Sequence, residues 1–188
     1  NDFKSNKKDY ISYFLLVGKA KNLYVINEKQ KSFQLLDSLF NVYKPLNTLA
    51  YDELELYCEL ALEFKKTNRL NEFVSILVTD YGYDLGNSND TLWTQIKKTI
   101  KYSDKDLKKK YSAFLEGINK PLRDSVVNIF KIDQEIRKTR NTFKIDSVDR
   151  INEIKTIAII KKYGYPSVKL IGGHGKDQLL SQATMSVL

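Results

Sequence analysis

Apolar residues recur every three or four positions through most of the chain, which is the period of an amphipathic α-helix. The first such segment begins near Lys8, and a second runs from Asn27 to Pro45. Pro45 ends the second helix because its ring and missing N–H interrupt the hydrogen-bond ladder. The two segments therefore predict an αα-hairpin.

A second pair of helices is predicted by residues 49–66 and 70–81, with the three residues between them as the turn. Phe33 and Phe73 occupy equivalent places in the two pairs, which gives a period of about 40 residues. This period is typical of stacked tetratricopeptide-like or HEAT-like helical pairs. Because only two copies occur and the usual consensus residues are missing, an irregular helical bundle fits equally well.

Loop and capping residues divide the next part of the chain. The glycine-, asparagine- and aspartate-rich segment 82–90 predicts a loop, after which Asp90 or Thr91 can cap the following helix. Ser103 or Asp104 can cap another helix. Beyond it, Gly117 marks a boundary and Pro121 suits the first turn of the next helix.

The C-terminal third begins with a long apolar stripe, formed by Leu122, Val126, Ile129, Ile136 and Phe143. Asp146 or Ser147 can cap the next helix, which has a nearly all-round apolar face near its end, formed by Val148, Ile151, Ile154, Ile157, Ala158 and Ile160. Such a helix is expected to be central and buried. Its end is predicted at Gly164, because Lys161 and Lys162 suit a helix C-terminus and Pro166 prevents continuation.

Asp133 fills a gap in that apolar stripe, so its carboxylate needs a partner or must be protonated. Arg137 lies one turn further on, and Gln134 lies beside it. Three interpretations stay open: an exposed helical ion pair, a structural polar network at a helix junction, or a ligand-binding or catalytic site.

Composition restricts the chemistry further. The chain has one cysteine, Cys58, and one histidine, His174, so it contains neither an internal disulfide nor the usual zinc ligands. Cys58 lies among leucines and is expected to be a buried small side chain. No apolar stretch reaches the roughly 20 residues that a membrane span requires. We assign no catalytic residue, metal or cofactor.

The net charge of +8 is unevenly distributed, since residues 51–100 are net acidic and the other parts are net basic. The densest basic run, residues 108–110, falls in a helical pattern near Asp104 and Asp106. A solvated helix face is favoured over a nucleic-acid interface, which normally gathers basic and aromatic residues on one element.

The glycine cluster at 172–175 does not match the phosphate-binding loop motif. Leu170 stands where the first glycine of that motif is needed, and Asp177 replaces the hydroxyl residue. The cluster is therefore expected to link a short extended segment, 168–171, to a last helix that starts near Lys176. His174 is expected to be solvated.

Several short motifs of the C-terminal third occur in a definite order: Asp133-Gln134-x-x-Arg137, Val148-Asp149-x-x-Asn152, Tyr163-Gly164-Tyr165-Pro166, Ile171-Gly172 and Gln182-Ala183. Over residues 131–188 this order resembles an uncharacterised bacterial domain family with the pattern D-Q-x-x-R, v-D-x-x-N, y-G-w-P, v-G and Q-H-A. Ala183 replaces the family's histidine, and the family's further C-terminal motifs are missing beyond Leu188.

The resemblance implies no established activity. It supports a boundary near residue 120, so we predict a helical-hairpin domain over 1–118 and a C-terminal helical unit over 119–188. It also implies a bacterial and exported protein. No leader is recognisable, but the chain opens at Asn1 rather than Met, so two expectations stay open: an N-terminal segment was removed, or it lies outside the given sequence.

The sequence thus predicts a mainly α protein made of αα-hairpins, tetratricopeptide-like or irregular, followed by a small helical unit. A non-enzymatic interaction or scaffold protein with a protein or peptide partner is the leading hypothesis. A small ligand-binding or enzymatic domain is the alternative, and its candidate residues are Asp133, Gln134, Arg137, Asn152, Tyr165 and Gln182. Nucleic-acid binding ranks last, and the oligomeric state stays open.

Overall fold

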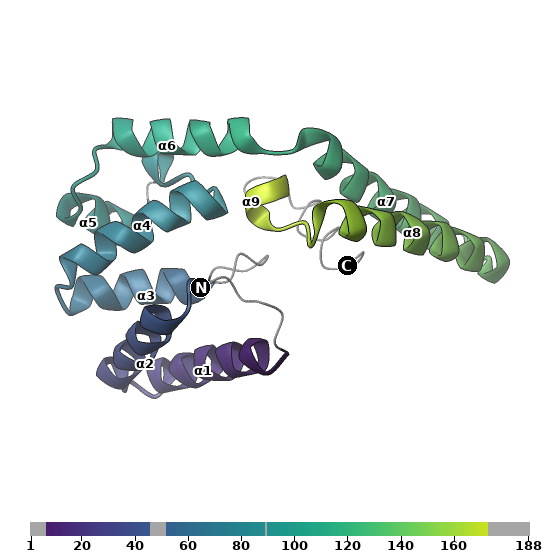
Figure 1. The fold of residues 1–188 in the computed structure, drawn as a ribbon. Helices are drawn as coiled ribbons and strands as arrows, with labels where there is room; N and C mark the ends of the chain where they lie inside the picture. Colours follow the sequence, from purple (N-terminus) through teal and green to yellow (C-terminus); the bar gives the residue numbers. More distant parts are fainter. Residues whose placement is uncertain (1–6, 46–51, 89, 173–188) are drawn as a thin grey trace. The chain divides into compact units, whose positions relative to one another are not determined.

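The computed structural model describes residues 7–45, 52–88 and 90–172 (Figure 1). These residues are mainly α-helical and contain no strand, which confirms the predicted fold class. In chain order the elements are α1 (Lys7–Val25), α2 (Lys29–Val42), α3 (Asp52–Glu63), α4 (Thr67–Tyr81), the 3-10 helix η1 (Leu85–Asn87), α5 (Thr91–Thr99), α6 (Asp104–Gly117), α7 (Lys120–Lys138), α8 (Thr142–Tyr163) and α9 (Val168–Ile171).

The described residues group into two compact units. The first contains residues 7–45, 52–77 and 85–107, and the second contains residues 78–84 and 108–172. Each unit is described by itself below. The predicted domain boundary between residues 118 and 119 stays a prediction.

In the first unit, α1 and α2 form the predicted hairpin. The buried Ser32 hydroxyl donates a hydrogen bond to the carbonyl oxygen of Ala20 at 2.8 Å, which ties the two helices together. Helix α2 begins at Lys29 rather than at Asn27, because Asn27 adopts a left-handed conformation (φ 64°) in the turn. Its apolar side, which includes Phe33, Leu36 and Phe40, is buried.

An aromatic cluster around Tyr57 of α3 fills the core of this unit. The Tyr57 ring stacks on Phe33 with 5.3 Å between centroids and meets Phe40 edge-on at 5.2 Å. Phe73 of α4 lies 4.4 Å from it. Phe33 and Phe73, the two residues that the sequence pattern aligns, therefore pack against the same ring. Cys58, which follows Tyr57 in the sequence, is fully buried, as predicted.

The turn between α3 and α4 lies three residues earlier than predicted. Thr67 and Arg69 belong to the first turn of α4, and the chain reverses at residues 64–66. The N–H of Lys66 bonds to the carbonyl of Ala61 at 2.7 Å, and the N–H of Lys65 bonds to that of Leu62 at 3.1 Å. This pair of bonds is a Schellman motif. The sequence did not indicate this motif, because its left-handed position (φ 57°) is occupied by Lys65 and not by glycine.

The predicted helix caps of the middle segments are confirmed. The Asp90 carboxylate accepts from the N–H of Leu92 at 2.9 Å, so Asp90 is the N-cap of α5. Before α6, the Ser103 hydroxyl accepts from the N–H of Asp106, whose carboxylate in turn accepts from the N–H of Ser103 at 3.0 Å. Pro121 lies in the first turn of α7, as expected.

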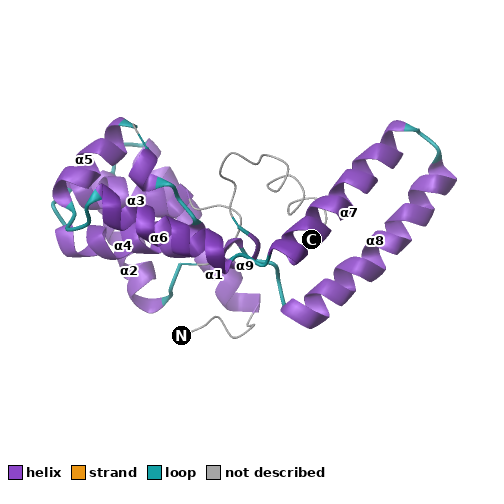
Figure 2. Ribbon diagram, turned by 90° about the horizontal axis from the view of Figure 1, so that it is seen from above, coloured by secondary structure: helices purple, strands orange, loops and turns teal. Residues whose placement is uncertain are grey.

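In the second unit, α7 and α8 run antiparallel and side by side, joined by a short loop (Figure 2). The short helix α9 packs against the N-terminal half of α7, where Leu122, Val126, Phe130 and Ile171 form a buried cluster. The N–H of Asn119 also donates to the carbonyl oxygen of Leu170 at 2.8 Å. The extended segment predicted for residues 168–171 is wrong, because these residues form α9.

The apolar stripe predicted to reach Phe143 is interrupted. Helix α7 ends at Lys138, the chain turns at Arg140 (φ 53°), and Asn141 caps α8 by accepting from the N–H of Lys144 at 3.1 Å. The predicted capping by Asp146 or Ser147 is therefore wrong, since both lie inside α8. Phe143 follows this turn and is 88% exposed.

The expectation that α8 is central and buried is also wrong. No residue of α8 is buried, and its isoleucines at 151, 154, 157 and 160 are between 43% and 68% exposed. Helix α8 packs along α7 through the side that carries Ile159, so the isoleucines at other angles stay at the surface. The predicted helix end is confirmed: Gly164 (φ 72°) donates its N–H to the carbonyl oxygen of Ile160 at 2.9 Å.

Candidate functional site

A cleft of about 330 Å³ lies between α7 and α8 in the second unit. It is lined by Ile129, Asp133 and Arg137 of α7 and by Asp149, Asn152, Glu153, Thr156 and Ile157 of α8. The α7 residues of this set follow the helical spacing of four residues, which brings them to one face. The α8 residues do the same at spacings of three and four.

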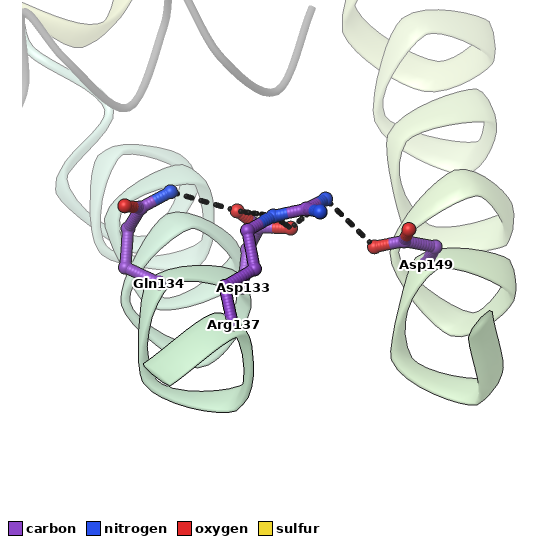
Figure 3. Close-up of polar contacts among 4 residues, drawn as sticks. All are labelled: Asp133, Gln134, Arg137 and Asp149. Atoms are coloured by element: carbon purple, nitrogen blue, oxygen red, sulfur yellow. Dashed lines mark hydrogen bonds and ion pairs between the residues drawn. The ribbon is translucent and has the colours of Figure 1, made fainter. Parts of the chain in front are cut away.

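Asp133 and Arg137 form the ion pair that their spacing predicts (Figure 3). The Nε of Arg137 donates to both carboxylate oxygens of Asp133, at 3.0 and 2.9 Å, and Nη2 donates to Oδ1 at 2.8 Å. Gln134 adds a fourth hydrogen bond, from Nε2 to Oδ2 of Asp133 at 2.8 Å. The Asp133 side chain is only 14% exposed, whereas that of Arg137 is 48% exposed.

Asp149 extends this pair from α7 to α8. The Nη2 atom of Arg137 donates to Oδ1 of Asp149 at 3.0 Å, so one guanidinium bridges carboxylates of two helices (Figure 3). The hydrogen bonds from Arg137 hold the pKa of the Asp133 carboxyl below its usual value, although partial burial opposes the shift. These contacts make the cluster an inter-helix polar network at the surface.

Asn152 and Glu153 follow Asp149 along the wall of the cleft. The Oδ1 atom of Asn152 is buried and accepts no hydrogen bond from the residues that the structure describes. Glu153 is exposed and lines the cleft. The cleft therefore presents three carboxylates against one guanidinium, and that guanidinium already contacts two of them.

The structure brings together part of the predicted site. Asp133, Arg137 and Asn152 line one cleft, and Gln134 supports Asp133 from its edge. Tyr165 lies beyond the end of α8, is 49% exposed and does not line the cleft. Gln182 and His174 lie outside the described residues, as does the helix predicted from Lys176.

Asp149 and Glu153 were missed as candidate residues. Asp149 stands three residues before Asn152 in the motif Val148-Asp149-x-x-Asn152, and this spacing places both side chains on one face of a helix. That signal was sufficient to include Asp149. Glu153 had no comparable signal, because its place in the cleft depends on how α8 is turned against α7.

The described residues contain neither a metal-binding cluster nor a membrane-spanning helix. Within residues 7–45, 52–88 and 90–172, no three His, Cys, Asp or Glu side chains are arranged as metal ligands. No described helix has both the length and the apolar character needed to cross a bilayer.

Comparison with protein-family models, curated proteins and solved structures found no match to this chain. The resemblance of residues 131–188 to an uncharacterised bacterial family stays a prediction.

Proposed function

We propose that the protein is a non-enzymatic helical interaction protein and that α8 provides its docking surface for a protein partner. The main support is the exposure of α8, a 22-residue helix without a buried residue. We call Ile151, Ile154, Ile157 and Ile160 the isoleucine face. A group of exposed large apolar side chains of this kind is typical of an interaction site.

The neighbouring helix supports the same assignment by contrast. The outward positions of α7 are polar, and include Asp124, Asn128, Lys131, Glu135 and Lys138. Its large apolar side chains, by comparison, are buried or partly buried, and none is among the exposed ones. Two helices of one hairpin therefore differ in the face that they present to solvent, which a purely structural hairpin does not require.

Site-specific photo-crosslinking tests this function. A photoreactive residue replaces Ile154, which is 68% exposed, or Asn128, an exposed polar position of α7, in cells that naturally produce the protein. We expect a discrete covalent adduct with a partner protein from position 154 and none from position 128.

The variant Ile154→Glu is the matched test of apolar docking. Its melting temperature should stay close to that of the native protein, because surface substitutions usually change stability by less than about 0.5 kcal/mol. The adduct from a photoreactive residue at 157 should disappear in the Ile154→Glu background. Equal adducts from positions 154 and 128, or no adduct from 154, would contradict the proposed function.

A further inference from the structure

The second half of α8 combines the isoleucine face with a concentration of positive charge. Residues 154–163 include three lysines, Lys155, Lys161 and Lys162, and no acidic residue, whereas residues 142–153 include three acidic and two basic residues. All three lysines are exposed, and none forms an ion pair with another residue that the structure describes. The surface beside the isoleucine face is therefore positive towards the C-terminal end of the helix.

Helical spacing places these lysines among the isoleucines rather than apart from them. Lys161 follows Ile157 by four residues and Ile154 by seven, so the three share one stripe of α8. Lys155 likewise follows Ile151 by four residues. A partner side chain that packs on the isoleucines therefore comes close to an ammonium group.

The helix end accounts for only part of this charge. Lys161 and Lys162 lie in the last turn of α8, where cations complement the partial negative charge of the terminal carbonyl groups. Lys155 lies eight residues before Tyr163, the last residue of the helix, and the effect of a helix end falls off within its last turn. Lys155 therefore adds positive charge that the helix end does not require.

We propose that the partner segment that docks on the isoleucine face is an acidic amphipathic one, whose apolar side chains pack on the isoleucines and whose carboxylates pair with the three lysines. This inference rests on the proposed function and adds the chemistry of the partner. Complementary charges across an interface speed association and fix the register of the two surfaces. Because Asp146 and Glu153 are exposed in the N-terminal half of α8, the acidic end of the partner lies against residues 154–163.

An anionic membrane surface would also attract lysines and isoleucines, but the arrangement favours a protein partner. Helices that lie in a membrane surface keep their polar face away from the lipid tails. Lys161 instead shares the stripe of Ile154 and Ile157. Asp146 and Glu153, which are exposed on the same helix, would repel anionic headgroups. The carboxylates of a protein segment, by contrast, can meet each ammonium group separately.

Photo-crosslinking in the native cells provides the first test. With the photoreactive residue at 157, the double variant Lys155→Gln and Lys161→Gln should reduce the yield of the adduct about fivefold, because two ion pairs are lost. Lys155→Arg with Lys161→Arg keeps both charges and should retain the adduct. Lys131→Gln with Lys138→Gln removes the same charge from exposed positions of α7 and should leave the yield unchanged. Equal yields in all of these variants would overturn the proposal and leave the proposed function intact.

The second test uses the full chain and a synthetic amphipathic peptide of about 15 residues, with leucines at helical spacing and glutamates beside them. NMR titration should give saturable shifts at the backbone amides of residues 151–163, and the affinity should fall as salt rises. The same peptide with glutamine in place of each glutamate should bind about threefold more weakly, and the peptide with lysine there more weakly still. Equal binding of the glutamate and glutamine peptides would overturn the proposal.

The two tests together distinguish failure of this inference from failure of the proposed function. An adduct at position 154 together with no binding of the acidic peptide would overturn the inference alone. Binding of the acidic peptide at α8 without any adduct at 154 would instead contradict the proposed function. Vesicles of phosphatidylcholine and phosphatidylglycerol are the comparison for a lipid surface. Binding of the protein to these vesicles but not to the acidic peptide would overturn the proposal in favour of a membrane surface.

Discussion

Two carboxylates of this protein respond to their surroundings in opposite directions. Glu53 of α3 is only 5% exposed, and the Tyr13 hydroxyl donates to its Oε1 atom at 3.3 Å. Burial raises the pKa of Glu53 despite that hydrogen bond. The pKa of Asp133 is lowered, because the guanidinium of Arg137 stabilises its ionised form. The pKa of each carboxyl group therefore depends on the balance between its burial and the hydrogen-bond donors around it.

Replacing Glu53 by glutamine should stabilise the first unit at neutral pH. A raised pKa penalises the ionised carboxylate in the folded state, so the penalty is absent below the unfolded value of about 4.3 and complete above the folded value. The difference between Glu53→Gln and the native protein should therefore grow as pH rises, as measured by urea unfolding at several pH values. Asp52→Asn, an exposed neighbour, is the control. A native protein that is more stable than Glu53→Gln at pH 7 would contradict this prediction.

Arg137→Ala should return the pKa of Asp133 towards its ordinary value, as measured by NMR titration of its carboxyl group. The stabilisation linked to a lowered pKa is present above the unfolded value of about 3.9 and is lost as pH falls through the folded value. As pH falls below about 4, the free energy of unfolding should therefore decrease less in Arg137→Ala than in the native protein. Gln134→Ala removes a single hydrogen bond and should shift this pKa less. No change of the Asp133 pKa in Arg137→Ala would show that the guanidinium is not its main partner.

At the scale of helices, three chain reversals among the described residues place a non-glycine residue in a left-handed conformation, at Asn27, Lys65 and Arg140. Asn27 ends α1 and Lys65 ends α3, each with the two hydrogen bonds of a Schellman motif. A left-handed conformation costs an ordinary L-residue roughly 1–2 kcal/mol, and asparagine tolerates it better than lysine. The turn at Lys65 is therefore the less favourable of the two.

Lys65→Gly should stabilise the protein by up to about 1 kcal/mol, because the removal of backbone strain exceeds the entropic cost of glycine. The measurement is the midpoint of denaturant unfolding. Lys66→Gly is the matched control, since Lys66 has no positive φ and should only lose stability. Destabilisation by both substitutions would argue against the left-handed assignment of Lys65.

For the molecule as a whole, the net charge of +8 is offset locally by acidic residues. Ion pairs such as Lys29 with Glu63 and Lys21 with Asp52 are distributed along the first unit. Lys108 and Lys109 are exposed on α6, in agreement with a solvated helix face. This mixed distribution differs from the continuous basic surface that phosphate backbones require.

We therefore expect weak, non-specific retention on a duplex-DNA column, with elution at low salt. Retention should fall with salt in proportion to the few phosphates contacted. A double variant with Lys108→Gln and Lys109→Gln should elute close to the native protein. Strong retention that these two substitutions abolish would contradict the prediction and favour the nucleic-acid hypothesis.

The sequence by itself determined features that depend on residues close together along the chain. The caps at Asp90 and Ser103, the helix end at Gly164 and the pair formed by Asp133 and Arg137 involve partners within four residues. Such contacts follow from helix geometry alone, which is why they could be predicted.

Only the tertiary structure decided which apolar and polar surfaces are covered. The isoleucine face is exposed, and Asp149 joins Arg137 across two helices, because α8 is turned so that its Ile159 side packs on the neighbouring hairpin helix. Helical periodicity shows which residues share a face, but it does not show which face meets a neighbour. That choice depends on packing between residues far apart in the sequence, and it placed the buried acceptor of Asn152 in the cleft.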